Sequence, residues 1–206
     1  HAVVRNYGVA IMLLTLLIKL IFWPITHKGM QGMRRMAELQ PKVKAIKEKI
    51  KDPQKQQQAI MALYKEHKVN PLGGCLPILV QIPVFIALFG VLRSAIELRF
   101  ASFLWIHDLS EPERLFHLGF SLPFLGEYFN LLPLLMAVTM VWQQKLTPTS
   151  GDAQQQKMMA MLMPIMLLVF LYNMPAGLIL YWTTNQVGTI VGQLLSRWRE
   201  KQKALA

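Results

Sequence analysis

Residues Tyr7–Thr26, YGVAIMLLTLLIKLIFWPIT, form a run of twenty positions in which Lys19 is the only charged side chain. About twenty mostly apolar residues are what a helix needs to cross a lipid bilayer. We therefore expect a transmembrane helix here. A charge inside such a helix is unfavourable by about 2.5–3.5 kcal/mol. Either Lys19 snorkels toward the interface, or it faces protein and water inside the membrane, and this helix alone favours neither.

The composition extends this interpretation to the whole chain. Of its 206 residues, 53% are hydrophobic and 16% are charged, whereas an ordinary soluble domain has about 25% charged residues. We predict an all-α, polytopic membrane protein with one membrane domain over residues 1–206. Five spans are expected, at about residues 7–26, 72–96, 129–144, 158–172 and 177–195. The third and fourth are short and would thin the bilayer around them.

The charges of the loops predict the orientation. Residues 28–70 hold eleven basic and four acidic residues, whereas residues 97–128 hold two basic and five acidic ones. Basic loops remain on the cytoplasmic side, so the N-terminus of this segment is expected outside and the C-terminus in the cytoplasm. The aromatic residues of the outer loop, residues 97–128, are expected to lie in interfacial helices on the outer leaflet.

Residues 28–70 are predicted to form a cytoplasmic helical hairpin. Asp52 and Pro53 suit the cap and the first position of its second helix. An apolar stripe at helical spacing precedes them, formed by Leu39, Val43, Ile46 and Ile50. The basic surface is either an ordinary solvated face or a contact for anionic lipids or the ribosome. Its candidate residues are Arg34, Arg35, Lys42, Lys47, Lys49, Arg197 and Arg199.

The spans offer polar groups but no catalytic set. They contain no phosphate-binding loop, no metal-ligand spacing and, in the last four spans, no acid for a proton relay. We therefore predict no enzyme activity, no cofactor and no metal. Neutral polar groups in a bilayer either join helices by hydrogen bonds or face water. The candidates for a hydrated groove are Lys19, Thr15, Gln81, Thr139, Gln143, Tyr181, Trp182 and Asn185.

Four motifs occur in order along the chain: NPLGGCLP at residues 70–77, QIPVF at 81–85, LWIHDL at 104–109 and PAGLILYW at 175–182. They resemble motifs of the YidC/Oxa/Alb family of membrane protein insertases. The motifs occur in the family's order and span nearly the whole chain. The resemblance implies five core helices around a hydrophilic groove, in the bacterial inner membrane. Because the chain begins with His1 rather than Met, we expect that some sequence precedes it. Gram-negative members of the family carry an additional N-terminal helix and a large periplasmic domain, and the sequence does not decide whether these precede His1.

The resemblance further implies one cation in the groove, and its position corresponds to Lys19. Bacterial members usually carry arginine there, so Lys19 keeps the charge but loses the two-pronged hydrogen bonding of a guanidinium group. Arginine at position 19 is therefore expected to be tolerated. The implied partners are nascent membrane proteins, the ribosome and anionic lipids, with a Sec translocon and a targeting receptor as further candidates.

The sequence thus predicts an insertase and chaperone that moves nascent membrane proteins from a groove open to the cytoplasm into the bilayer, without nucleotide hydrolysis. The main alternative is a small-solute or ion transporter, which would need coupled ionisable sites or an inverted repeat. A second alternative is an intramembrane enzyme, which would need paired catalytic residues. The sequence shows no sign of either requirement.

Overall fold

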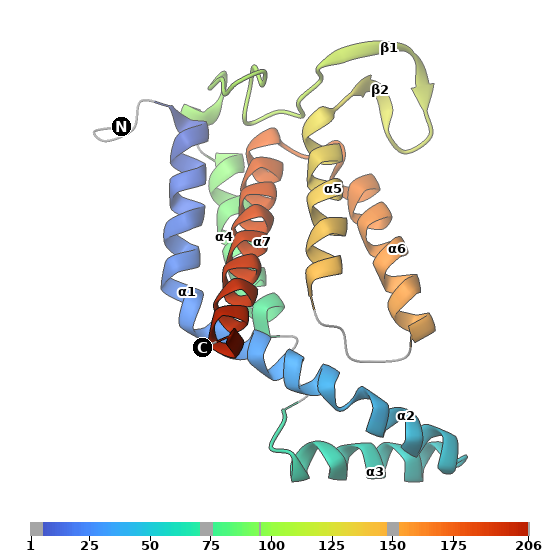
Figure 1. Ribbon diagram of the computed structural model, residues 1–206. Helices are drawn as coiled ribbons and strands as arrows, with labels where there is room; N and C mark the ends of the chain where they lie inside the picture. Colours follow the sequence, from blue (N-terminus) through green and yellow to red (C-terminus); the bar gives the residue numbers. More distant parts are fainter. Residues whose placement is uncertain (1–5, 71–75, 95, 148–152, 206) are drawn as a thin grey trace. The chain divides into compact units, whose positions relative to one another are not determined.

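The computed structural model describes residues 6–70, 76–94, 96–147 and 153–205. As predicted, the chain is mostly helical (Figure 1). The helices are α1 (Tyr7–Glu38), α2 (Gln40–Lys49), α3 (Pro53–Glu66), α4 (Leu76–Ser94), α5 (Leu131–Leu146), α6 (Ala153–Leu171) and α7 (Ala176–Leu205), with a short 3-10 helix at Ile96–Leu98. Two compact units are present: unit 1 holds residues 1–21, 84–147 and 158–206, and unit 2 holds residues 22–83 and 148–157.

Helix α1 begins where expected but continues to Glu38, beyond the predicted end at Thr26. Pro24 lies inside it. Proline removes one backbone hydrogen bond, but the Lys-, Gln-, Met- and Arg-rich sequence that follows strongly favours helix. For the same reason α7 runs to Leu205, past the predicted end near residue 195.

The five predicted spans are not confirmed as five. Within the described ranges, α1 alone is long and apolar enough to cross a membrane by length and composition. Gln81–Val91 and Ala160–Leu171 are shorter apolar helical stretches. Many large apolar side chains nevertheless point outward, including Leu20 of α1 and Met161 of α6, each 69% exposed. Such a surface is typical of contact with lipid or another protein.

The outer loop corrects the all-α prediction in one place. Instead of interfacial helices, it contains an antiparallel hairpin of β1 (Phe116–Leu122) and β2 (Gly126–Phe129). Phe116 pairs with Phe129, and their rings stack with centroids 4.8 Å apart. The residues of β1 alternate apolar and polar or small, as strands do. Gly126, at φ +85°, closes the turn in a conformation that glycine tolerates.

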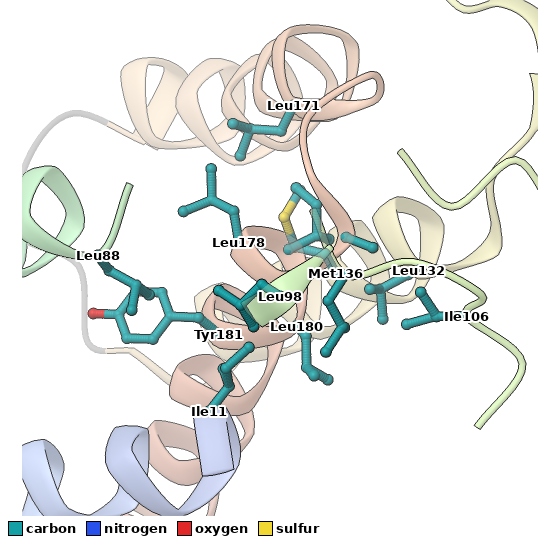
Figure 2. Close-up of a cluster of buried hydrophobic side chains, with 13 residues drawn as sticks. Ile11, Leu88, Leu98, Ile106, Leu132, Met136, Leu171, Leu178, Leu180 and Tyr181 are labelled. Atoms are coloured by element: carbon teal, nitrogen blue, oxygen red, sulfur yellow. The ribbon is translucent and has the colours of Figure 1, made fainter. Parts of the chain in front are cut away.

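The core of unit 1 gathers side chains from every part of that unit's sequence. Figure 2 shows Tyr181 of α7 in one cluster with Ile11 of α1, Leu88 of α4 and Met136 of α5. Ile106 and Leu109 of the outer loop are completely buried in the same cluster. The backbone N–H groups of Ala176 and Gly177 donate to carbonyls of that loop. The loop is therefore fixed to the start of α7.

Within the predicted hairpin of residues 28–70, α2 and α3 are helices that pack together, whereas residues 28–38 continue α1. The cytoplasmic position of this segment stays a prediction. Asp52 caps α3 by accepting a hydrogen bond from the Gln54 N–H at 2.9 Å. Gln56 donates from its side chain to the carbonyls of Lys47 and Ile50 and so satisfies the end of α2. The apolar stripe packs into a small core made of Met36, Leu39, Val43, Ile60, Tyr64 and Val69.

Candidate functional site

Lys19 points at α7. Its Nζ donates hydrogen bonds to Oδ1 of Asn185 at 2.7 Å and to Oγ1 of Thr189 at 2.6 Å. The two acceptors are one helical turn apart and so lie on the same face of α7. Hydrogen bonds from an ionised donor are shorter and stronger than neutral ones. The ammonium group is thus held by protein rather than extended along α1 toward the interface.

Thr189 was not among the predicted site residues. Its hydroxyl donates to the carbonyl of Asn185 at 2.9 Å, which leaves the lone pairs of its oxygen to accept from Lys19. Its spacing of four residues from Asn185 was the available signal, because a helix places such residues on one face.

Gly188 was also missed, and it shapes the contact. A Cβ at this position would lie 2.8 Å from Cδ and 2.9 Å from Cε of Lys19. The lysine stem therefore passes directly over the backbone of α7, where any side chain would displace it. A glycine inside a helix is unfavourable by about 1 kcal/mol relative to alanine, so its occurrence there indicates a packing reason.

A second set of polar contacts joins α7 to α5. Thr139 donates to Oε1 of Gln186 at 2.5 Å, and Gln193 donates to Oγ1 of Thr147 at 3.0 Å. Gln186 and Gln193 are buried. The polar residues of α7 thus serve two faces, one toward α1 and one toward α5, and Figure 1 shows α7 between those helices. Thr139 acts here as an interhelical hydrogen-bond donor.

The other predicted groove residues have different surroundings. Thr15 is buried and donates to the carbonyl of Ile11 at 2.6 Å. Tyr181 lies in the apolar cluster, and Trp182 meets the ring of Phe85 edge-on at 5.5 Å. Gln143 is half-buried on α5, and Gln81 lies on α4 in unit 2. Direct contact is described for one pair of the predicted set, Lys19 with Asn185, and the groove itself stays a prediction.

The helical segments that could surround Lys19 contain almost no acidic residues. None of the eleven Asp and Glu residues of the chain lies in Tyr7–Thr26, in α5 or in α6, and α7 carries Glu200 alone, near its end. Among the residues that the structure describes, no group of three or more His, Cys, Asp or Glu could hold a metal ion. Both acceptors of the ammonium group are therefore neutral oxygens.

The outer loop contains a buried polar cluster that sequence reasoning did not find. We call it the outer clamp, formed by Trp105, Glu113, Asn130 and Tyr172. Glu113 accepts hydrogen bonds from the indole N–H of Trp105 and, at 2.6 Å, from the backbone N–H of Leu132 in the first turn of α5. A carboxylate at a helix N-terminus is favourable because unpaired N–H groups point at it. The clamp thus fixes the loop to the start of α5.

Asn130 is the second connection in the outer clamp. Its side chain donates to the carbonyl of Tyr172 at 2.9 Å and accepts from the N–H of Arg114 at 2.8 Å. The hydroxyl of Tyr172 in turn accepts from the N–H of Asn130 at 3.0 Å. These contacts join the outer loop to the segment between α6 and α7.

The predicted basic surface is only partly free of internal contacts. Lys42 lies 2.9 Å from Nε2 of His67, and Arg197 donates to the carbonyl of Leu146 at 2.6 Å. Arg35 and Lys49 are exposed, whereas Arg34 and Lys47 are half-buried. The side chain of Arg199 lies outside the described residues. Binding of ribosomal RNA or anionic lipid by this surface stays a prediction.

Comparison with known proteins identifies the family. Residues 1–203 match the family described as 60Kd inner membrane protein. The chain is 52% identical to the membrane protein insertase YidC of Syntrophobacter fumaroxidans, over 92% of this chain and 34% of that protein. It is 50% identical to the YidC insertase of Pelobacter propionicus, over 93% of this chain and 35% of that protein. The chain therefore spans about a third of the length of these relatives.

A solved structure agrees with this assignment. The crystal structure of an active YidC insertase, with its first transmembrane domain resolved, matches 95% of this chain and 42% of its own, at 34% identity and a TM-score of 0.67. The mostly helical fold is thus shared with a solved insertase. This chain belongs to the 60Kd inner membrane protein family, the family of the YidC insertases that its motifs resemble.

Proposed function

We propose that this chain forms the part of a bacterial inner-membrane insertase that moves nascent membrane proteins into the lipid bilayer. Its sequence identity of 52% and 50% to two YidC insertases supports this activity. The observation that carries the proposal is the placement of Lys19, the only charged residue of the apolar run Tyr7–Thr26, which neutral acceptors of α7 hold in place. Such a cation attracts acidic or polar segments of a nascent chain.

In this proposal residues 1–206 act as one membrane domain. Helices α1, α4, α5, α6 and α7 span the bilayer, with the N-terminus of this segment outside and the C-terminus in the cytoplasm. The outer loop, residues 97–128, lies on the outer leaflet, and residues 28–70 lie in the cytoplasm. The hydrophilic groove is lined by Lys19, Thr15, Gln81, Thr139, Gln143, Tyr181, Trp182 and Asn185. The outward apolar side chains of α1 and α6 support contact with lipid.

The mechanism combines attraction with a shortened path. Lys19 lowers the free energy of an acidic segment that has partly entered the membrane. Helix α5 has sixteen residues and so spans about 24 Å, less than the roughly 30 Å of a typical hydrocarbon core. The apolar part of the substrate then moves sideways into lipid by its own hydrophobic partitioning. The membrane potential adds about 2.3 kcal/mol per charge per 100 mV, and no nucleotide is needed.

The basic surface would bring substrates to the membrane domain. Exposed side chains such as Arg35 and Lys49 support electrostatic contact with the ribosome or anionic lipids. A targeting receptor and a Sec translocon are further proposed partners. Contacts of this kind weaken as salt rises, so ribosome binding should decrease with ionic strength.

The experiment is insertion by the intact protein in proteoliposomes. Two substrates are compared that differ in one respect: the translocated tail carries two Asp residues in the first and two Asn residues in the second. We expect Lys19→Met to lower insertion of the acidic substrate by about tenfold, which corresponds to about 1.4 kcal/mol. Lys19→Arg keeps the charge and should retain most of the insertion. Equal insertion by wild type, Lys19→Met and protein-free liposomes would rule out the proposed function.

A further inference from the structure

We propose that Asn185, Gly188 and Thr189 of α7 form a neutral seat for Lys19, a site that positions the ammonium group without neutralising its charge. The proposal rests on the proposed function and adds three positioning residues to it. As a consequence, an acidic group of the substrate can accept a hydrogen bond from the remaining N–H of the ammonium group, and it does not have to displace a carboxylate of the protein.

The position of the ammonium group is determined from two sides. The neutral oxygens of Asn185 and Thr189 lie 2.7 and 2.6 Å from Nζ. The stem is held by the backbone at Gly188, where a Cβ would come within 2.8 Å of Cδ. The hydroxyl proton of Thr189 is directed to the carbonyl of Asn185. Its oxygen therefore presents lone pairs to the cation, and the seat is oriented before any substrate arrives.

The seat leaves the charge available. A lysine ammonium group has three N–H donors, and within the described part of the chain two of them are directed at Asn185 and Thr189. The third can be donated to an incoming carboxylate. The apolar helices supply no competing acid, because Asp and Glu are absent from Tyr7–Thr26, α5 and α6. A full positive charge in surroundings of low polarity attracts an acid more strongly than it would in water.

Neutrality is the property that an isosteric substitution can remove. Asp at position 185 has the shape of Asn and keeps the Oδ1 acceptor, but it places a negative charge next to Nζ. The cation would then have a permanent partner, and a substrate carboxylate would have to compete with a like charge. If the seat acts by holding a cation without a counter-charge, Asn185→Asp should have the same effect on insertion as Lys19→Met, although Lys19 is still present.

The test uses the intact protein in proteoliposomes and the substrates with acidic and neutral tails. We expect Asn185→Asp to lower the ratio of acidic to neutral insertion by about tenfold, about 1.4 kcal/mol, to the ratio of Lys19→Met. Thr189→Val, which removes one acceptor, should lower the ratio, whereas Thr189→Ser, which keeps the hydroxyl, should restore it. Gly90→Ala of α4 is the matched control, since nothing lies within 4 Å of a Cβ there.

Two results would overturn the neutral seat. One is a wild-type ratio for Asn185→Asp, and the other is an equal loss for both substrates, which would show that Asn185 only supports the fold. The seat can also be tested without insertion, by a double-mutant cycle of thermal unfolding in detergent with Lys19→Met and Asn185→Leu. Additive changes would overturn the contact. A coupled pair in a protein that inserts neither substrate would reject the proposed function and leave the contact standing.

Discussion

The stem of Lys19 crosses α7 at Gly188, where the backbone has no side chain to keep the two helices apart. A Cβ there would lie 2.8 Å from Cδ of the lysine and 3.9 Å from its Nζ. The tight contact thus involves the flexible methylenes rather than the charged atom. A larger residue at this position would displace the lysine without disturbing the backbone of either helix.

Gly188→Ala separates positioning from stability. Alanine favours helix over glycine by about 1 kcal/mol, but the two hydrogen bonds of Lys19 are lost when its stem moves aside, so we expect thermal unfolding in detergent to change little. The ammonium group should nevertheless leave its acceptors, and the ratio of acidic to neutral insertion should decrease. Gly90→Ala disturbs no neighbour, so it should raise stability by about 1 kcal/mol with an unchanged ratio. If Gly188→Ala kept the wild-type ratio, the contact at Gly188 would have no part in positioning Lys19.

Glu113 should contribute measurably to stability through the outer clamp. Its buried carboxylate accepts hydrogen bonds from Trp105 and from the first turn of α5. Glu113→Ala leaves these donors buried without a partner, which typically costs about 1–3 kcal/mol. Glu113→Gln keeps one acceptor oxygen and should cost less. Thermal unfolding in detergent, followed by circular dichroism, measures both. Equal stability of Glu113→Ala and wild type would show that water replaces the carboxylate without loss.

The lowered pKa of Asp108 predicts that the stability of the protein decreases at acidic pH. Burial raises the pKa of this carboxyl, but hydrogen bonds from the side chain and backbone of Ser110 and the backbone of Phe100, together with the charge of Arg99, outweigh burial and lower the pKa below 3.8. The unfolded chain therefore binds the proton more readily. The contribution of Asp108 to stability is complete above pH 3.8 and is lost as the pH decreases through the folded pKa.

Asp108→Asn gives the measurement. Asparagine keeps the oxygen that accepts from Ser110 but does not titrate. The difference in melting temperature between wild type and Asp108→Asn should favour wild type near pH 6 and become smaller as the pH decreases below 3.8. A difference independent of pH would mean that the charge of Asp108 does not stabilise the folded state.

The sequence predicted the features that depend on local chemistry. The start of α1 at Tyr7 follows from an apolar run, and the cap at Asp52 follows from residue type and position. The predicted spans end before α1 and α7 do, because an apolar window ends where the membrane would end, whereas Lys, Arg and Gln continue a helix into water. The β-hairpin at Phe116–Phe129 was not predicted. The aromatic residues of the loop favoured interfacial helices in the prediction, and the alternation of apolar with polar or small residues in β1 was given no weight.

The sequence predicted several residues of the site but not which of them contact one another. Asn185 and Gln186 are sequence neighbours of similar chemistry, yet Asn185 accepts from Lys19 and Gln186 from Thr139. Adjacent residues of a helix point about 100° apart, so they meet different neighbouring helices. Which neighbour each one meets depends on how α1, α5 and α7 pack, and such contacts between distant segments are not encoded in the local pattern.

The β-hairpin offers a test of the proposed position of the outer loop. Phe124 at its turn is 82% exposed, and Phe120 is 59% exposed, although exposed aromatic rings are unfavourable in water. In Figure 1 the hairpin extends past α5 and α6, beyond the ends of those helices. If the loop lies on the outer leaflet, these rings enter the interfacial layer of the bilayer, where aromatic side chains are favoured.

A fluorescent probe at position 124 measures this contact. Cys75, the lone cysteine, is replaced by serine, Phe124→Cys is introduced, and the thiol is labelled with a dye that is sensitive to polarity. In proteoliposomes we expect a blue-shifted emission that lipid-borne quenchers reduce. The same dye at Glu111→Cys, an exposed charged position near the base of the hairpin, should stay in water and be reached by soluble quenchers. If soluble quenchers reached the dye at position 124 as well as they reach position 111, and lipid-borne quenchers reached neither, the hairpin turn would lie outside the bilayer.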